Sequence, residues 1–283
     1  MLGQRIVTAI VLLAVLLPAL FHPQAAYFNF LILILIGAAG WEWGKLNNAS
    51  KTGAVGLGVF CVMVCASAWF GGVLEIRTTL TGLWFGVSAF WVIGGAVLLR
   101  GGVPLWRSIP RAIRLGLGPV VLVSVWLSVA HAKLVGVNFL LSIFLLVWVA
   151  DIFAYFAGKA WGGRLFKNKL APSISPGKSW EGVWGGMFGV LVLSQVWRWI
   201  DSHYAMANPS LFSILFEKGW VAHLVLILLL AAMSVVGDLV ESLIKRSAGA
   251  KDSSGLLPGH GGVLDRVDAL LPVFPVSMLL SSL

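Results

Sequence analysis

The run WVAHLVLILLLAAMSVVGDLV at residues 220–240 contains a single charged side chain, Asp238. A helix of about 20 apolar residues is long enough to cross the hydrocarbon core of a bilayer. Runs of this kind recur along the chain, at about residues 5–22, 26–44, 53–71, 81–99, 115–131, 136–157 and 182–200. The pattern therefore predicts an all-α integral membrane protein, a polytopic bundle of eight transmembrane helices.

The composition supports this fold class. Of the 283 residues, 59% are hydrophobic and only 11% are charged, whereas a soluble domain carries about 25% charged residues. These values exclude a soluble globular enzyme, a disordered chain and a disulfide scaffold. The net charge of +9 favours anionic partners such as lipid head groups or nucleotides. We expect no nucleic-acid partner.

The end of the chain is ambiguous. Residues 269–283 are apolar but few, and they include Pro272 and Pro275. Because a spanning helix needs about 20 residues, the sequence leaves open a ninth helix that is partly inserted or re-entrant.

Charge predicts the orientation of the bundle. With a cytoplasmic N-terminus, sixteen of the twenty Lys and Arg residues fall on the cytoplasmic side. The other four are Arg77, Lys133, Arg198 and Lys218. Because cytoplasmic loops carry the excess of Lys and Arg, we expect a multi-pass protein of the cell inner membrane. Its N-terminus and the long loops 158–181 and 241–266 would face the cytoplasm.

The acidic residues divide the chain unevenly. Residues 1–135 contain only two, Glu42 and Glu75, and the other nine follow later. We interpret residues 1–283 as one membrane domain, with scaffold helices in 1–135 and a catalytic half in 136–283.

Two carboxylates lie within or at the end of apolar runs. A carboxylate in the hydrocarbon costs on the order of 2.5–3.5 kcal/mol or more unless it is paired or hydrated. Asp151 shares a helix face with Tyr155 and Lys159. Asp238 is followed seven residues later by Lys245. The Asp151 pattern predicts either a structural ion pair near the cytoplasmic end or a site residue facing a polar cavity. For Asp238 the alternatives are a solvated helix end with local salt bridges or a site residue.

Residues 242–268 read SLIKRSAGAKDSSGLLPGHGGVLDRVD. The segment 258–262 cannot be ordinary helix because of its Pro and Gly residues, and its backbone amides can approach a phosphate closely. Asp265 and Asp268 share a helix face at i,i+3 spacing. With Asp238 they offer hard oxygen ligands that suit Mg²⁺, which usually takes one or two carboxylates plus substrate phosphates. A charged cytoplasmic loop would explain the bases but not the interleaved acids.

Residues 169–182, KLAPSISPGKSWEG, contain a Gly-Lys-Ser triplet. They are not a P-loop, because Pro172 stands where that motif requires glycine. Two interpretations remain: a constrained loop that offers Lys178 and the Ser179 hydroxyl to an anion, or a turn capped by Ser179. For His260, turn stabilisation and acid/base work are equally compatible with the sequence.

Carboxylates, bases and flexible loops together are typical of metal-assisted phosphoryl or nucleotidyl transfer. A membrane-embedded site of this kind implies a lipid phosphate or lipid alcohol as substrate. The alternatives are an ion-coupled transporter with Asp151 and Asp238 as coupling sites, or another lipid-phosphate transferase or kinase.

Residues 242–268 closely resemble the signature of the phosphatidate cytidylyltransferase family, the CDP-diacylglycerol synthases. WVADIFAYFAG at 148–158 and SPGKSWEG at 175–182 are also similar to that family. The resemblance implies that CTP and phosphatidic acid give CDP-diacylglycerol and pyrophosphate at the cytoplasmic face, in phospholipid biosynthesis.

The resemblance also implies roles for individual residues. It implies Mg²⁺ with a second cation, held by Asp238 and Asp265 with help from Asp268, and a catalytic Lys245. The expected substrate-binding residues are Lys178, Ser179, Arg246, Lys251, His260, Arg266, Asp151 and Tyr155. The expected partners are CTP, phosphatidic acid and membrane lipids, and glycine-rich helix faces are compatible with a homodimer.

Overall fold

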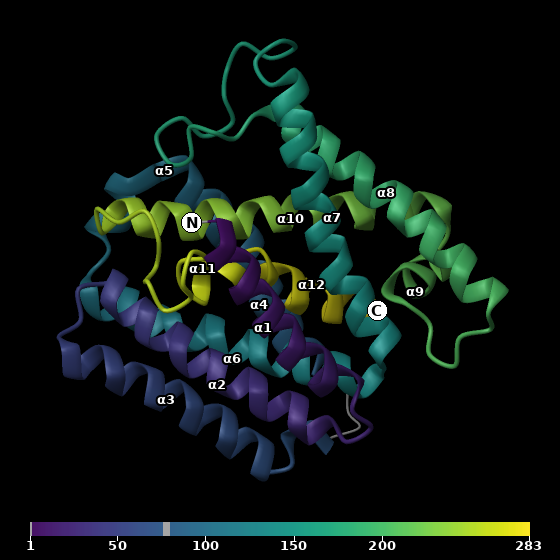
Figure 1. Cartoon of the computed structure of the whole chain (residues 1–283), viewed down its shortest axis with the longest axis horizontal. Coiled ribbons are helices and arrows are strands. Elements are labelled where there is room, and N and C mark those ends of the chain that lie inside the picture. Colours follow the sequence, from purple (N-terminus) through teal and green to yellow (C-terminus); the bar gives the residue numbers. More distant parts are fainter. Residues whose placement is uncertain (1, 76–79) are drawn as a thin grey trace.

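The computed structural model describes residues 2–75 and 80–283, and in that part of the chain every regular element is a helix (Figure 1). The predicted non-cytoplasmic Arg77 lies outside the described residues. The front half contains α1 (Leu2–Phe21), α2 (Ala25–Leu46), α3 (Lys51–Phe70), η1 (Val73–Glu75), α4 (Thr81–Ala89), η2 (Phe90–Gly94), α5 (Gly95–Ser108) and α6 (Arg111–Val135). The back half contains α7 (Val137–Trp161), α8 (Trp180–His203), α9 (Leu211–Glu217), α10 (Trp220–Ser247), α11 (Leu264–Val267) and α12 (Leu270–Ser282).

Within the described residues, six helical stretches are long and apolar enough to cross a membrane. They are α2, α3, the continuous stretch Thr81–Ser108, α6, α7 and α10. Each coincides with a predicted span, so the all-helical, polytopic membrane fold is confirmed. The other two predicted spans are helical as well, but the apolar stretch of α1 is short and α8 carries Glu181, Arg198 and Asp201. The number of eight spans stays a prediction.

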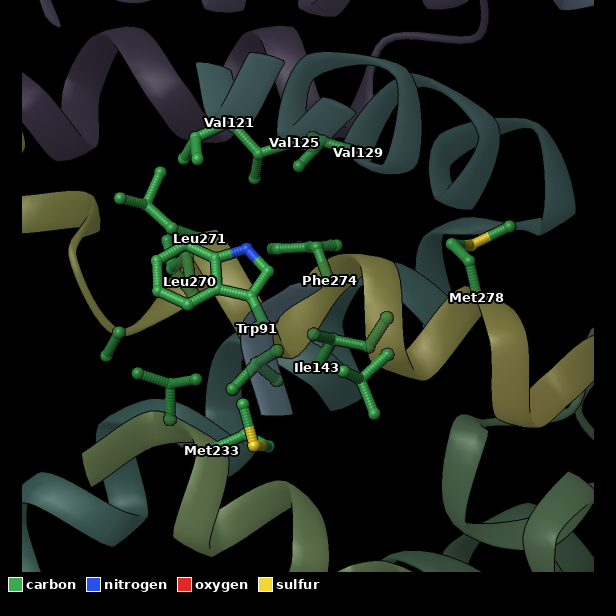
Figure 2. Packing of buried hydrophobic residues seen from close by; sticks show 14 of the residues in the cluster. Trp91, Val121, Val125, Val129, Ile143, Met233, Leu270, Leu271, Phe274 and Met278 are labelled. Atoms are coloured by element: carbon green, nitrogen blue, oxygen red, sulfur yellow. The ribbon is translucent and has the colours of Figure 1, made fainter. Parts of the chain in front are cut away.

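The C-terminal segment forms a core helix. The 13 residues of α12 extend for roughly 20 Å at 1.5 Å per residue, which is too short to cross the hydrocarbon. Every residue of Leu270–Leu280 is buried. Phe274 packs near Trp91 and Ile143, among side chains from α6 and α10 (Figure 2). The bundle is thus built around α12, which contacts α4, α6, α7, α9 and α10.

A stripe of glycines joins α8 tightly to α7. A Cβ atom added to Gly185 would lie 2.2 Å from the Cβ atom of Ala157, and one added to Gly186 would lie 2.7 Å from the carbonyl oxygen of Ala150. Small residues let two helix backbones approach closely within a membrane. This contact holds the two helices that carry the motifs at 148–158 and 175–182.

We expect Gly185→Val to destabilise the protein by about 1–3 kcal/mol, because overpacking forces closely packed backbones apart. The measurement is the melting temperature of the purified protein in detergent. Gly56→Val in α3 is the matched control, because a Cβ atom at Gly56 meets nothing within 4 Å. Equal melting temperatures for the two variants would contradict the tight α7–α8 contact.

Two long connections meet at one end of the bundle. Residues 162–179 join α7 to α8, and residues 248–263 join α10 to α11. The Arg246 Nε atom, near the end of α10, donates a hydrogen bond to the Ile174 carbonyl oxygen at 3.3 Å. Both predicted motif loops therefore lie at the same end of the molecule.

Candidate active site

A cavity of about 400 Å³ lies between α7, α8 and α10, beside the connection 162–179. Small residues on α7 and α8 leave the space for it. Its polar and charged lining consists of Asp151, Tyr155, Lys159, Lys178, Ser179 and Asp238. Five of these are predicted site residues, so the structure brings together the Asp151 helix, the Gly-Lys-Ser turn and the end of the 220–240 run.

The local structure explains why these side chains meet. Asp151 and Tyr155 are one turn apart on α7, and the Lys159 Nζ atom lies 5.8 Å from the centre of the Tyr155 ring. Ser179 is the N-cap of α8, and its Oγ atom accepts a hydrogen bond from the Gly182 N–H at 3.2 Å. The capped turn is therefore real, and it holds Ser179 at the cavity wall as well.

The strongest link across the cavity is an ion pair between the Lys178 Nζ atom and the Asp238 Oδ2 atom. The Ser242 hydroxyl donates to the Asp238 Oδ1 atom at 3.3 Å. Lys178 and Asp238 are each partly exposed, so neither charge is locked in the interior. The cavity thus presents a carboxylate and an ammonium group that both remain accessible to a ligand.

A second charged cluster lies on the 242–268 segment. The Lys245 Nζ atom is 2.5 Å from the Glu241 Oε2 atom and 2.6 Å from the Asp265 Oδ1 atom. The Asp265 Oδ2 atom accepts from the Ser253 N–H at 2.8 Å, the Ser253 hydroxyl at 2.8 Å and the Gly262 N–H at 2.7 Å. Asp265 is thus a clasp within its own loop and is not among the residues that line the cavity.

The electrostatics of Asp265 agree with this geometry. Burial acts to raise its pKa, but the hydrogen bonds from Lys245, Gly262 and Ser253 outweigh burial, and the pKa lies below its usual value. The carboxylate is therefore held in its charged form at neutral pH.

Asp268 lies beside Asp238. Its carbonyl oxygen packs on α10 so closely that a Cβ atom at Gly237 would lie 2.4 Å away. Burial, together with the neighbouring Asp238 carboxylate, raises the pKa of Asp268, whereas Lys245 and Lys178 act to lower it. Asp268 thus lies within electrostatic reach of both charged clusters.

The structure does not bring the other predicted bases to the cavity wall. Arg246 donates to backbone carbonyl groups of Ile174 and Ala250. Lys251 and Arg266 are exposed. The remaining residue, His260, takes part in a turn through its backbone N–H, which donates to the Leu257 carbonyl oxygen at 2.8 Å.

Sequence reasoning assigned no role to Glu42 of α2. The structure buries its carboxylate completely and sets it against the 253–264 segment, where it accepts several hydrogen bonds. A signal was present, because Glu42 is one of only two acids in the front half and lies at the end of an apolar run.

The carboxylates fit one kind of metal site. Among the described residues, no group of three or more His, Cys, Asp or Glu side chains is arranged to hold a metal ion. Mg²⁺, however, usually binds through one or two carboxylates together with substrate phosphates. Asp151 and Asp238 line the same cavity, with Asp268 close by. This donor set suits a magnesium ion that binds together with a phosphate-bearing substrate.

Comparisons with known proteins agree with the resemblance. The sequence pattern of the cytidylyltransferase family matches residues 3–283. The phosphatidate cytidylyltransferase of Pseudomonas aeruginosa is 35% identical over 285 residues, which cover 98% of this chain and 95% of the relative. That of Haemophilus influenzae is 36% identical, with 97% and 96% covered. That of Thermotoga maritima is 39% identical over 47% of this chain and 44% of the relative.

Proposed function

Because the chain belongs to the cytidylyltransferase family, we propose that its cavity is where the cytidylyl group of CTP is transferred to phosphatidate. The enzyme is a nucleotidyltransferase, and the products are CDP-diacylglycerol and pyrophosphate. The observation that carries the assignment of the site is the convergence of Asp151, Lys178 and Asp238 on one cavity. The chain's long apolar helices suit a substrate that stays in the membrane.

The reaction is a displacement at phosphorus. A phosphate oxygen of phosphatidate forms a bond to the α-phosphorus of CTP, and the bond from that phosphorus to the bridging oxygen of the β-phosphate breaks. Because the lipid phosphate is already anionic near neutral pH, no strong general base is required. The protein's contribution is to position the two substrates and to balance their charges. Lys178 and Lys159, with the Ser179 hydroxyl, line the cavity and suit phosphate oxygens.

Mg²⁺, together with a second cation, belongs to this proposal. Asp238 would hold the Mg²⁺ ion, with the Asp268 side chain close to Asp238. Asp265 is the third proposed ligand, although it is not among the residues that line the cavity and its Oδ1 atom accepts from Lys245. When bound, the metal would neutralise phosphate charge. Each of two carboxylates, Asp238 and Asp265, binds a lysine ammonium group, and this supports the proposal of a cation at these positions.

The membrane arrangement is also proposed. The cavity is bordered by the end of α7, where Tyr155 is 62% exposed and Phe156 is 63% exposed. Such exposed aromatic side chains suit the membrane–water interface beside the bundle, where the phosphate of the lipid lies. CTP would arrive from the side of the basic loops, which the positive-inside rule assigns to the cytoplasm. The inner-membrane location rests on the same rule, whereas the proposed homodimer rests on the glycine-rich helix faces.

The direct test is the incorporation of label from α-phosphate-labelled CTP into lipid by the purified protein. We expect incorporation only when phosphatidic acid and Mg²⁺ are both present. Chelation with EDTA should reduce it to background, and added Mg²⁺ should restore it. Diacylglycerol in place of phosphatidic acid is the control, because it lacks the attacking phosphate. Label transfer that ignores the lipid phosphate would refute the proposed reaction, and full activity in EDTA would refute the metal.

A further inference from the structure

Helix α2, in the predicted scaffold half, holds residues 253–264 (the signature loop) in place through one side chain, Glu42. Its Oε1 atom accepts from the Ser254 hydroxyl at 2.5 Å and from the Val263 N–H at 2.9 Å. Its Oε2 atom accepts from the Leu264 N–H at 2.8 Å and lies 3.1 Å from the Ser253 hydroxyl. Both oxygens are engaged, and the residue is 0% exposed. The partners lie more than 200 residues away in the sequence.

The fit around this carboxylate is tight. A Cβ atom added to Gly262 would lie 2.3 Å from the Glu42 Oε1 atom and 2.1 Å from the Ser253 Oγ atom. Only glycine fits there without displacing one of the two. A second contact from the front half reaches the same loop, because the Thr8 hydroxyl of α1 donates to the Pro258 carbonyl oxygen at 2.9 Å.

Glu42 is connected to the charged residues of the proposed site. The Ser253 hydroxyl lies within hydrogen-bond distance of both the Glu42 Oε2 atom and the Asp265 Oδ2 atom. Asp265 in turn binds Lys245. The two amides held by Glu42 directly precede Asp265 in the sequence. A shift of this backbone would therefore move Asp265, and through it the partner of Lys245.

We propose that Glu42 is a positioning residue for cytidylyl transfer: it fixes residues 253–264, so that Asp265 stays paired with Lys245 and the following Asp268 stays near Asp238. The inference rests on the proposed function. If it is right, residues 1–135, which the sequence assigns to the scaffold, contribute one side chain, Glu42, to the function of the site.

The chemistry favours this role over simple filling of space. A carboxylate that accepts several N–H and O–H donors makes charge-assisted hydrogen bonds, which are stronger than neutral ones. Glutamine has nearly the same shape, but its amide nitrogen donates, so it would face the donors of the loop on one side. Glu42→Gln therefore keeps the packing and breaks the grip.

The test combines kinetics with amide exchange on the full-length protein in detergent. Mutation of a residue that supports metal ligands from the second layer typically lowers metal affinity or activity by about 10- to 100-fold. We therefore expect Glu42→Gln to lower kcat by about that factor. The KM for phosphatidate should change by less than about threefold, because α7 and α8 are untouched. Hydrogen exchange across residues 253–268 should become faster, since the Val263 and Leu264 amides lose their acceptor.

Asp201→Asn is the matched control. The Asp201 carboxylate, on α8, likewise accepts several donors, among them the Asn138 amide and the hydroxyls of Ser210 and Ser213. It is not among the residues that line the cavity. We expect this variant to lower the melting temperature while kcat per folded molecule and exchange at residues 253–268 stay as in the unchanged protein.

The outcomes separate the alternatives. Three results would overturn the inference. The first is an unchanged kcat in folded Glu42→Gln protein, and the second is a lower kcat without faster hydrogen exchange at residues 253–268. The third is a lower kcat together with faster exchange at these residues in Asp201→Asn. If Glu42→Gln does not fold, Ser254→Ala replaces it, because this variant removes only one hydrogen-bond donor to Glu42. A several-fold lower kcat with faster hydrogen exchange would support the inference. An unchanged kcat and unchanged exchange would overturn it. If the unchanged protein transfers no label, the proposed function fails instead.

Discussion

Asp238→Asn should reduce CTP-dependent label transfer to phosphatidate by about 10²- to 10³-fold, the loss typical of removing one preorganised electrostatic group. The side chain lines the cavity and pairs with Lys178. An amide keeps the shape but carries no charge, so it neither anchors Lys178 nor attracts a divalent cation. The measurement is the initial rate of the purified variant, compared at equal amounts of folded protein.

Lys51→Ala is the control for this experiment. Lys51 is an exposed residue at the start of α3 and is not among the residues that line the cavity. We expect its rate to match that of the unchanged protein. If Asp238→Asn retains full activity, the cavity is not the site of transfer and the metal proposal loses its first ligand.

The sequence predicts the membrane helices well because their main determinant is local. A run such as residues 220–240 must form a helix in hydrocarbon, since every backbone N–H and C=O group has to be satisfied within the segment. The glycine stripe of α8 is also readable, because small residues at helical spacing mark a close helix contact. Within the described residues, six candidate spans follow from such local patterns, whereas the partner of the glycine stripe, α7, is known only from the structure.

The role of α12 was not predictable in the same way. Its apolar residues are compatible with a short span, a re-entrant helix or a core helix. Only its contacts with α4, α6 and α10 show that it fills the centre of the bundle. Burial of such a helix depends on the shape of the surrounding elements, which single-segment hydropathy does not contain.

In the candidate site, too, some residues can be predicted from local sequence and others cannot. Asp151, Lys178 and Asp238 are recognisable because polar residues in or beside apolar runs are costly and need a reason. In the structure all three line one cavity. The clasp around Asp265 and the grip of Glu42 on the signature loop involve partners distant in sequence, whose positions are set by the tertiary fold.

The second large effect is expected for Asp265→Asn. The Asp265 carboxylate accepts four hydrogen bonds. They come from the Lys245 ammonium group, the Ser253 N–H, the Ser253 hydroxyl and the Gly262 N–H. Breaking a buried pair by removing one partner typically costs about 3–5 kcal/mol. We therefore expect a lower melting temperature and a rate of label transfer reduced by on the order of 100-fold, since Lys245 and the loop lose their common anchor.

Glu217→Gln is the matched control for the loss of one negative charge, because Glu217 is exposed at the end of α9. A Mg²⁺ titration of both variants distinguishes two roles of Asp265. A ligand role requires that Asp265→Asn need more Mg²⁺ for half-maximal rate. A clasp alone requires the same Mg²⁺ dependence with faster amide exchange across residues 253–264. An Asp265→Asn protein with normal rate, stability and exchange would remove Asp265 from the site altogether, because neither a ligand nor a clasp can lose its charge without consequence.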